Sequence, residues 1–530
     1  MSIKKKIFSL LNVLVGIILV LSACSGSEET SSEGEDQSGK SIEKAGGEIT
    51  FGLAAEPTTL NTYMQNGTHG RTIKLAISRG LYNYNENGEL EAELAESYEA
   101  NDELTSYTFE LRDAKFHNGD KVTGEDVKYT FERIIDDEST ATFNDDLSLI
   151  DDIEVIDETT VTFHLSEPSA PFLHYTALPE SVIVSKDWTE EHPDEVETYQ
   201  MGAGPFKFVE WNQGSHLVVE KFEDYYKEDK PYLDEVRFEF FDDENTRVNA
   251  LRSEDAELIE TVPWKDATSI EEAQHLKLDN KNGPFMQLQF NTEFEPFSDP
   301  KVRRALAYAI DRDNIIKTAF SGRGEPIYGM AILDGYLGYD EKFENYFEQD
   351  YEKAKELLTE AGYPDGFEAT LLATSQYGMH EQTAVAVQSE LKKVGIEVEL
   401  DLPDWATRTN KNMEGDYDFL VAGTAGDITD ADWMSNFYEG GEVRLNNSAY
   451  FDDEQINQLL EEGREESDEA KREEIYQELM TRAMELSPFV YLNWREQSYG
   501  MVENINGFTN LDGFLSFQSG VTLEETYIEE

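Results

Sequence analysis

Three carboxylates and several aromatic side chains gather in one stretch of the sequence, residues 416–438. Residues 417–422 are mostly apolar and predict a short buried strand, which runs into a glycine-rich turn at residues 423–426. The acidic residues that follow are Asp427, Asp430 and Asp432. Because α/β folds place ligands at the carboxyl ends of buried strands, a cation site is one of two interpretations that the local pattern supports equally. A solvated acidic turn is the alternative in a chain so rich in carboxylates.

Other patterns that could support catalysis or metal binding are missing from the sequence. The H-E-x-x-H and G-x-S-x-G motifs do not occur, and no two of the eight histidines are spaced i,i+4. His117 lies on a predicted turn, where a structural role is favoured over a catalytic one. Residues 85–88, NENG, lack the ligand spacing and distal glutamate of a calcium loop, so a plain hairpin turn is expected. We therefore expect no catalytic residue, no metal site and no cofactor.

The N-terminal residues predict export. Three lysines at positions 4–6 precede an apolar run at residues 7–20, which is short for a membrane span and typical of a signal peptide. The sequence Leu-Ser-Ala-Cys that ends at Cys24 resembles the lipobox of bacterial lipoproteins, which implies a signal peptide at 1–23 and a lipid on Cys24. Residues 25–40 contain no apolar side chain, so residues 24–46 are expected to be a disordered tether. Cys24 is the only cysteine, which excludes disulfides within the chain and thiol catalysis in the folded part.

Size and charge narrow the class of protein further. Nearly five hundred residues follow the tether, too many for one core, so two or more lobes are expected. The net charge of -68 makes nucleic acid an implausible partner, because phosphate binding needs the opposite sign. This acidity is interpreted as an adaptation to high salt or high pH.

Periodicity and capping residues predict the elements that must position the stretch 416–438. Strands are expected at 48–53 and 107–111, helices at 72–80, 123–134 and 300–315, and a charged helix at 461–478. Arg303, Arg304, Asp311 and Arg312 are interpreted as surface residues with i,i+4 partners. The charged helix at 461–478 is interpreted as a solvated face.

Several segments in a fixed order carry a family resemblance. Residues 94–134 are similar, nearly position by position, to the signature of the family 5 extracellular solute-binding proteins, the peptide-binding components of ABC importers. Further matches are residues 202–211 (the GAGPF…W hairpin), 300–315 (PKVRRALAYAIDRDNI), 351–367 (YEKAKELLTEAGYPDGF) and 391–398 (LKKVGIEV). The resemblance therefore covers almost all of the chain after the tether.

This resemblance implies an α/β, two-lobed, periplasmic-binding-protein-like fold with an extra α/β subdomain inserted in lobe I. Lobe I would comprise residues 47–61, 202–285 and 487–530, the inserted subdomain residues 62–201, and lobe II residues 286–486. The buried-type strand expected at residues 489–492 supports a C-terminal segment that joins a lobe rather than forming its own core.

The implied function is capture of a solute between two closing lobes and its delivery to a permease. In peptide-binding members an aspartate in a loop of the form G-W-x-[AG]-D-x-x-x-P binds the peptide's ammonium group, and this role maps to Asp427. Thr424 stands where a tryptophan is common, and Ala431 where a proline is common. The loop residues Thr424, Ala425 and Gly426 and the aromatic residues Trp433, Trp405 and Tyr417 are candidates for lining the crevice, although burial in the core is favoured for each of the aromatic residues. Asp430 and Asp432 are expected to have turn and surface roles.

The predicted protein is thus a monomeric, lipid-anchored peptide binder at the extracellular face of the cell membrane, or in the periplasm if the cell has an outer membrane. Its partners would be the permease subunits with their ATPases. A nickel chelate, a sugar or another small solute is the alternative ligand, for which Asp427→Asn should cost no affinity. A receptor that signals through the importer and a surface hydrolase are further alternatives.

Overall fold

The computed structural model describes residues 44–64, 67–136, 138–441 and 443–529. The predicted signal peptide, the lipidation site at Cys24 and most of the predicted tether lie outside the described residues. Within the described ranges, no helix combines the length and apolar character needed to cross a membrane.

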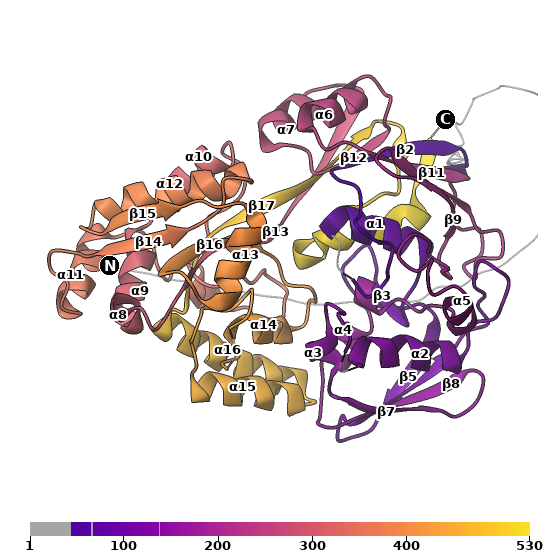
Figure 1. Cartoon of the computed structure of the whole chain (residues 1–530), viewed down its shortest axis with the longest axis horizontal. Coiled ribbons are helices and arrows are strands. Elements are labelled where there is room, and N and C mark those ends of the chain that lie inside the picture. Colours follow the sequence, from indigo (N-terminus) through magenta and orange to yellow (C-terminus); the bar gives the residue numbers. More distant parts are fainter. Residues whose placement is uncertain (1–43, 65–66, 137, 442, 530) are drawn as a thin grey trace, which may run out of the picture. The chain divides into compact units, whose positions relative to one another are not determined.

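A ten-stranded mixed sheet forms the centre of the described structure, in the order β15-β14-β16-β13-β17-β12-β2-β11-β10-β9 (Figure 1). The strands are β2 (Glu48–Leu53), β9 (Phe206–Asn212), β10 (His216–Lys221), β11 (Glu235–Phe240), β12 (Leu258–Glu260), β13 (Leu276–Phe290), β14 (Glu368–Leu372), β15 (Glu397–Asp401), β16 (Phe419–Thr424) and β17 (Phe489–Val502). β14 is parallel to β15 and β16, and β2 is parallel to β11 and β12. The sheet therefore contains two parallel α/β units.

Two long antiparallel strands, β13 and β17, join these units. They pair with each other along most of their length, and each also pairs with a neighbour, β13 with β16 and β17 with β12. The register of the β13–β17 pair shifts between Asn282 and Phe285 and again between Met286 and Gln287. The predicted lobe boundary at 285/286 falls inside β13, beside the second of these irregularities. A two-lobed fold is confirmed, while the exact lobe limits stay a prediction.

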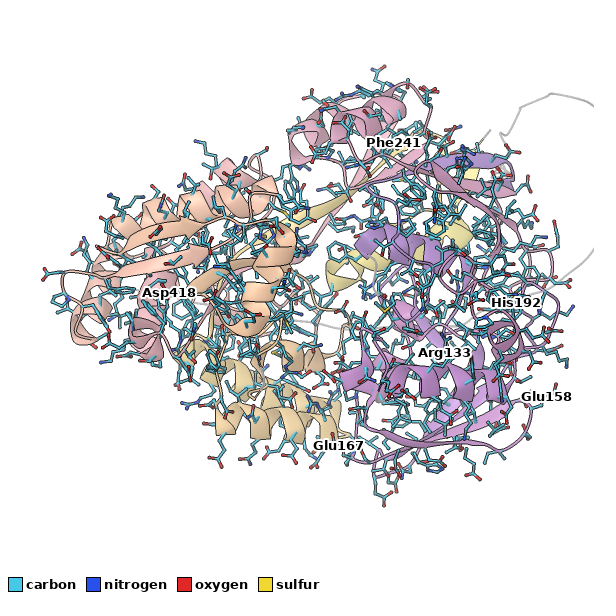
Figure 2. All side chains as sticks on the ribbon, in the orientation of Figure 1. Arg133, Glu158, Glu167, His192, Phe241 and Asp418 are labelled. Carbon is cyan, nitrogen blue, oxygen red and sulfur yellow. The ribbon has the colours of Figure 1, made fainter. Side chains whose placement is uncertain are left out.

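Helices cover the sheet, and acidic N-caps begin many of them. The longer ones are α1 (Gly67–Ile77), α6 (Glu244–Arg252), α7 (Trp264–Glu271), α9 (Pro300–Ala309), α10 (Arg312–Ala319), α11 (Tyr351–Glu360), α12 (Gly378–Lys392), α13 (Trp405–Glu414), α15 (Glu454–Glu465) and α16 (Glu469–Leu486). Asp404 and Asp468, for example, accept hydrogen bonds from the first turns of α13 and α16. Other carboxylates, such as those of Glu158 and Glu167, lie exposed at the surface (Figure 2).

The interpretation of residues 300–315 was wrong in two respects. The segment forms two helices, and Asp311 is the N-cap of the second helix rather than an i,i+4 partner. Arg303 and Arg312 are buried and donate to backbone carbonyls, among them those of Ser487 and Tyr491. These arginines satisfy carbonyl groups that would otherwise be buried without partners, which sequence spacing alone does not reveal.

A second, four-stranded sheet lies within residues 62–201, where the inserted subdomain was predicted. Its strands are β5 (Ala95–Ala100), β6 (Ser106–Leu111), β7 (Ile150–Val155) and β8 (Thr160–Leu165), and α2 (Gly124–Ile135) packs on it. The predicted strand at 107–111, the capped helix after Thr123 and the hairpin turn at 85–88 are confirmed. His117 contacts the carbonyl of Gly204 at 3.1 Å through Nε2, in keeping with a structural role.

Candidate functional site

The loop after β16 is the candidate site, because it contacts three segments from the N-terminal part of the chain, which contain Arg71, Tyr84 and Tyr175. β16 ends at Thr424, and the chain continues through residues 425–430 into η3 (Ala431–Met434). Asp427 Oδ1 accepts a hydrogen bond from Arg71 of α1 at 2.8 Å. The backbone N–H of Thr429 donates to the Tyr84 hydroxyl at 3.3 Å, and the Tyr175 hydroxyl donates to Asp432 at 2.8 Å. We name residues 424–434 the closure loop.

Asp427 already has a cationic partner. The Arg71 guanidinium donates to Asp427 and also to both carboxylate oxygens of Glu180, at 3.1 Å each, and Lys74 contacts Glu180 at 3.1 Å. The Arg71 and Glu180 side chains are each 2% exposed, whereas that of Asp427 is 27% exposed. Burial raises the pKa of Asp427 above its ordinary value, and the charge of Arg71 opposes this rise. An incoming ammonium group would therefore share this carboxylate with Arg71.

Asp430 and Asp432 were expected at the surface, and this expectation was wrong. Asp430 is 5% exposed and accepts two hydrogen bonds from Arg472, at 2.6 and 2.8 Å. Asp432 is 1% exposed and accepts from Arg464 at 2.9 Å. Burial raises the pKa of Asp432 to about 6 against the opposing charge of Arg464. Carboxylates this deep remain charged only when paired, which explains why each has its own arginine.

These two arginines also correct the interpretation of residues 461–478 as a solvated face. The segment is interrupted at residues 466–468, and Arg464 on α15 and Arg472 on α16 both reach the closure loop. Each segment presents most of its acidic side chains to solvent, as expected, but its arginine side chain turns inward. The sequence signal for such a role is weak, because a single arginine within a mixed charge run looks like an ordinary helix-surface partner.

The glycine and aromatic positions of the closure loop pack against η4 (Gly513–Glu525). A Cβ atom on Gly426 would lie 2.6 Å from the Phe514 ring, so the loop passes η4 at a distance that only glycine permits. Trp433 is 2% exposed and packs against Phe514 and Phe437, with ring centroids 5.0 and 5.2 Å away. Thr424 and Ala425 are partly exposed. Phe514 thus supplies an aromatic side chain beside a loop that lacks the family's tryptophan at position 424.

Tyr417 and Trp405 do not join this group. Tyr417 lies two residues before β16 begins, at the opposite end from Asp427, and its hydroxyl accepts the N–H of Ala449 at 3.1 Å. It is buried in a small apolar cluster, so its assignment to the crevice is corrected to the core. Trp405 begins α13 and packs edge-on to Tyr377 and His380, with centroids 5.2 and 5.7 Å away. That group lies at the carboxyl ends of β14 and β15.

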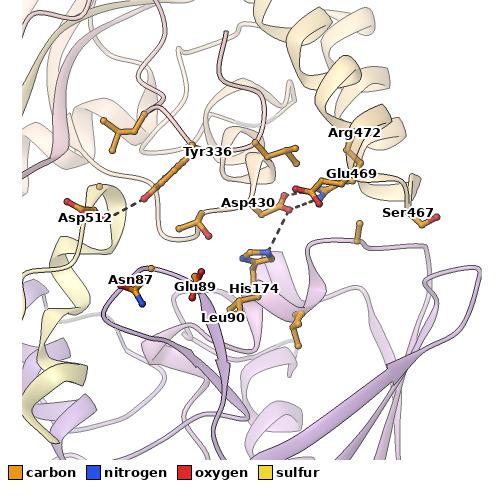
Figure 3. Close-up of a pocket in the computed structure, with 18 of the residues that line it drawn as sticks. Asn87, Glu89, Leu90, His174, Tyr336, Asp430, Ser467, Glu469, Arg472 and Asp512 are labelled. Atoms are coloured by element: carbon orange, nitrogen blue, oxygen red, sulfur yellow. Dashed lines mark hydrogen bonds and ion pairs between the residues drawn. The ribbon is translucent and has the colours of Figure 1, made fainter. Parts of the chain in front are cut away.

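A cavity of about 1040 Å³ borders the closure loop (Figure 3). Thr429 and Asp430 line it from the closure loop, Asn87 and Glu89 from the β3–β4 hairpin (Tyr82–Tyr84 and Leu90–Ala92), and Tyr336 and Asp512 from other segments. Figure 3 shows Asp430 between His174 and Arg472, which it contacts at 3.9 and 2.6 Å. In the part of the chain that the structure describes, no group of three or more His, Cys, Asp or Glu side chains is arranged to hold a metal ion. The carboxylates of the closure loop bind arginines instead.

Comparison with known proteins places these features in a family. The model described as "Bacterial extracellular solute-binding proteins, family 5 Middle" matches residues 89–444. The glutathione-binding protein GsiB of Escherichia coli K12 is 28% identical over 472 residues, which is 87% of this chain and 91% of that protein.

Solved structures match over a similar length. AgaA of A. tumefaciens R10, in complex with agropinic acid, is 55% identical, with a TM-score of 0.83 over 91% of this chain and 99% of that chain. DppA of Helicobacter pylori, an ABC transporter-associated periplasmic binding protein in complex with the peptide STSA, is 25% identical, with a TM-score of 0.80 over 92% and 99% of the two chains.

Proposed function

The chain belongs to the bacterial extracellular solute-binding proteins of family 5, and from this premise we propose that it captures a small organic acid for an ABC importer. Members of this family are substrate-binding proteins of transporters rather than enzymes. The task of this chain is therefore to bind its solute and release it unchanged to the permease.

The observation that carries the capture mechanism is the set of contacts made by the closure loop. Asp427, Thr429 and Asp432 each contact a different segment of the N-terminal part of the chain, namely α1, β3 and α4 (Phe172–Tyr175). β13 and β17 run between the two α/β units, so bending at these strands would make or break the contacts together. A solute that touches both units favours the closed arrangement, because only there do both sets of contacts form.

Two classes of solute remain as candidates. The 55% identity to AgaA over nearly the whole of both chains favours an acid of the kind that AgaA binds. The family resemblance and the 28% identity to GsiB favour a peptide, including glutathione, with Asp427 as the ammonium ligand. The 2.8 Å contact of Arg71 with Asp427 Oδ1 weakens the second candidate, since a peptide's ammonium group would have to share this carboxylate with Arg71. We therefore propose the organic acid as the solute and retain the peptide as the second candidate.

Titration calorimetry of the purified protein with agropinic acid, glutathione and the peptide STSA tests this choice. We expect agropinic acid to bind at least about 100-fold more tightly than either peptide, a difference of about 2.7 kcal/mol. Tight peptide binding that Asp427→Asn abolishes, without binding of agropinic acid, would establish the second candidate instead. Failure of all three solutes to bind would contradict both.

We further propose that the protein is a monomer held at the extracellular side of the membrane by a lipid on Cys24. The support is the lipobox-like sequence that ends at Cys24, together with a hydrophilic segment long enough to separate the anchor from the folded part. The intact mass of protein extracted from membranes should exceed that of residues 24–530 by the mass of the acyl groups, and Cys24→Ser should release the protein from the membrane. A membrane-bound Cys24→Ser variant would refute the anchor.

A further inference from the structure

A second cavity, of about 470 Å³, lies at the carboxyl ends of β12 and β14. We propose that this cavity binds the carboxylate of the solute through Arg495, an inference that rests on the proposed function and specifies how the acid is recognised. The residues that line it come from the loop after β12, from the loop after β14 and the start of α12, and from residues 495–498 of β17, together with Glu244, Pro284, Ala319 and Ser321.

The position of this cavity suits a solute that bridges the two α/β units. β12 belongs to the unit that contains β2 and β11, and β14 to the unit that contains β15 and β16. β17 carries Arg495 between them (Figure 1). Ligands of α/β sheets bind outside the carboxyl ends of parallel strands, and a volume of this size holds a small molecule.

Arg495 is the unpaired charge of this cavity. Among the other charged residues that line it, Lys265 pairs with Glu244 at 3.0 Å, and Glu496 pairs with Arg323. No carboxylate of the described residues lies within 4.0 Å of the Arg495 guanidinium, whose recorded contact is with Met379 Sδ at 3.3 Å. Arg303 and Arg312 also lack a carboxylate partner, but they donate to backbone carbonyls, whereas Arg495 contacts a thioether sulfur.

The lack of a carboxylate partner leaves the positive charge of Arg495 without compensation at a site that is partly shielded from water. Arg495 is partly exposed, but its Nε is buried without a hydrogen-bond partner in the described structure, and burial lowers the pKa of the guanidinium to about 10. A partly buried charge without a counter-ion has a desolvation cost, which a ligand can offset by supplying the counter-ion. A planar carboxylate matches the paired N–H donors of arginine and would supply that charge.

One neighbouring side chain indicates what else the solute carries. Ser498 is among the residues that line the cavity, is 2% exposed, and its Oγ has no hydrogen-bond partner among the described residues. A hydroxyl in this state can pair with a hydroxyl or carbonyl group of a ligand. The solute class is thus a small carboxylic acid with a hydroxyl or carbonyl group, with Arg495 binding its carboxylate.

The imidazole of His380 lies close to this region and adds no positive charge beside Arg495. Burial, together with the charges of Arg408 and Arg495, lowers the pKa of His380 to about 3, so this imidazole is neutral and places no second cation there. A Cβ on Gly423 would lie 3.4 Å from His380 Nε2, which places this region directly beside the start of the closure loop. Binding at Arg495 would therefore be felt where the closure loop leaves β16.

Calorimetry with agropinic acid as the probe tests the assignment. We expect Arg495→Met to weaken binding at least about 100-fold and Arg495→Lys to restore part of the loss, because lysine keeps the charge but not the paired donors. Arg252→Met is the matched control: Arg252 lies on α6, is 41% exposed and pairs with Asp266 outside the cavity, and its loss should leave affinity within about threefold.

A ligand-free measurement separates binding from folding. Because Arg495→Met removes a partly buried charge that has no counter-ion, its melting temperature without solute should equal or exceed that of the wild type. A melting temperature several degrees lower, recovered in Arg495→Lys, would assign a structural role and overturn the inference. Wild-type binding of agropinic acid with unchanged affinity in Arg495→Met overturns this inference alone, whereas failure of the wild type to bind the acid overturns the proposed solute as well.

Discussion

Replacement of Arg472 by methionine is expected to destabilise the folded protein by about 3–5 kcal/mol, the cost of leaving one partner of a buried ion pair alone. Asp430 accepts hydrogen bonds from both terminal nitrogens of Arg472, and these two residues are 5% and 7% exposed. Burial raises the pKa of Asp430, but the hydrogen bonds and charge of Arg472 outweigh it and hold the pKa below its ordinary value. His174, at 3.9 Å, is the nearest other cation candidate, and burial lowers its pKa, so it is a poor replacement.

Urea unfolding at pH 7 measures this cost, and α16 offers a matched control. Arg482 lies on the same helix and pairs with Asp453 at 2.7 Å, but the Arg482 side chain is 31% exposed, so Arg482→Met should cost less than about 1 kcal/mol. Adding Asp430→Asn to Arg472→Met removes the unpaired charge and should recover part of the loss. If Arg472→Met and Arg482→Met lowered the free energy of unfolding by equal amounts, the buried Asp430–Arg472 pair would contribute no more to stability than the exposed pair.

The Asp430–Arg472 pair also marks the limit of prediction from sequence. Local sequence patterns predict the strand before the closure loop, the glycine turn and a role for the acidic stretch. The order of several motifs indicates the family. The partners of the carboxylates cannot be predicted in this way, because Arg71 is 356 residues from Asp427 and Arg472 is 42 residues from Asp430. Such pairings depend on the tertiary fold, and local charge patterns do not encode them.

The burial of arginine side chains is a second feature that the sequence patterns did not predict. Arg303 and Arg312 occupy helical positions where surface arginines are common, yet both are buried against backbone carbonyls. Arg495 lies in the polar middle of β17, after an apolar run, and only the folded structure shows that no carboxylate pairs with it. Sequence analysis therefore found a plausible ammonium site at Asp427 and missed the unpaired guanidinium, because pairing is a property of three-dimensional neighbours.

Ionisation of Glu260 is expected to make the free energy of unfolding depend on pH, with an effect about as large as that of Arg472→Met. Glu260 ends β12, is fully buried, and its Oε1 accepts the N–H of Ala54 at 2.9 Å, while Oε2 has no partner among the described residues. Burial raises the pKa of Glu260 to about 7, against the opposing effects of the Ala54 N–H and the charge of Arg247. An unfolded glutamate has a pKa of about 4.3, so the folded state holds this proton more tightly.

The sign of the effect follows from this difference. Between about pH 4.3 and 7 the folded state keeps a proton that the unfolded state has lost, so the free energy of unfolding falls as the pH rises. The loss approaches about 3–4 kcal/mol and is complete above pH 7, where Glu260 is ionised in both states. Other carboxylates with lowered pKa values, such as Asp430, act in the opposite direction but only below about pH 4.

Glu260→Gln should remove this part of the pH dependence, because glutamine keeps an acceptor for the Ala54 N–H and carries no charge. We expect the variant to be more stable than the wild type by up to about 3–4 kcal/mol at pH 8 and to differ little at pH 5. Urea unfolding from pH 5 to 8 in 0.5 M NaCl measures the difference while salt screens repulsion among the surface carboxylates. Glu257→Gln, which removes a partly exposed carboxylate that accepts the Thr50 N–H at 2.7 Å, controls for the loss of one negative charge. A slope in Glu260→Gln equal to that of the wild type would assign the pH dependence to other buried carboxylates, such as Asp432, whose pKa is raised by burial to about 6.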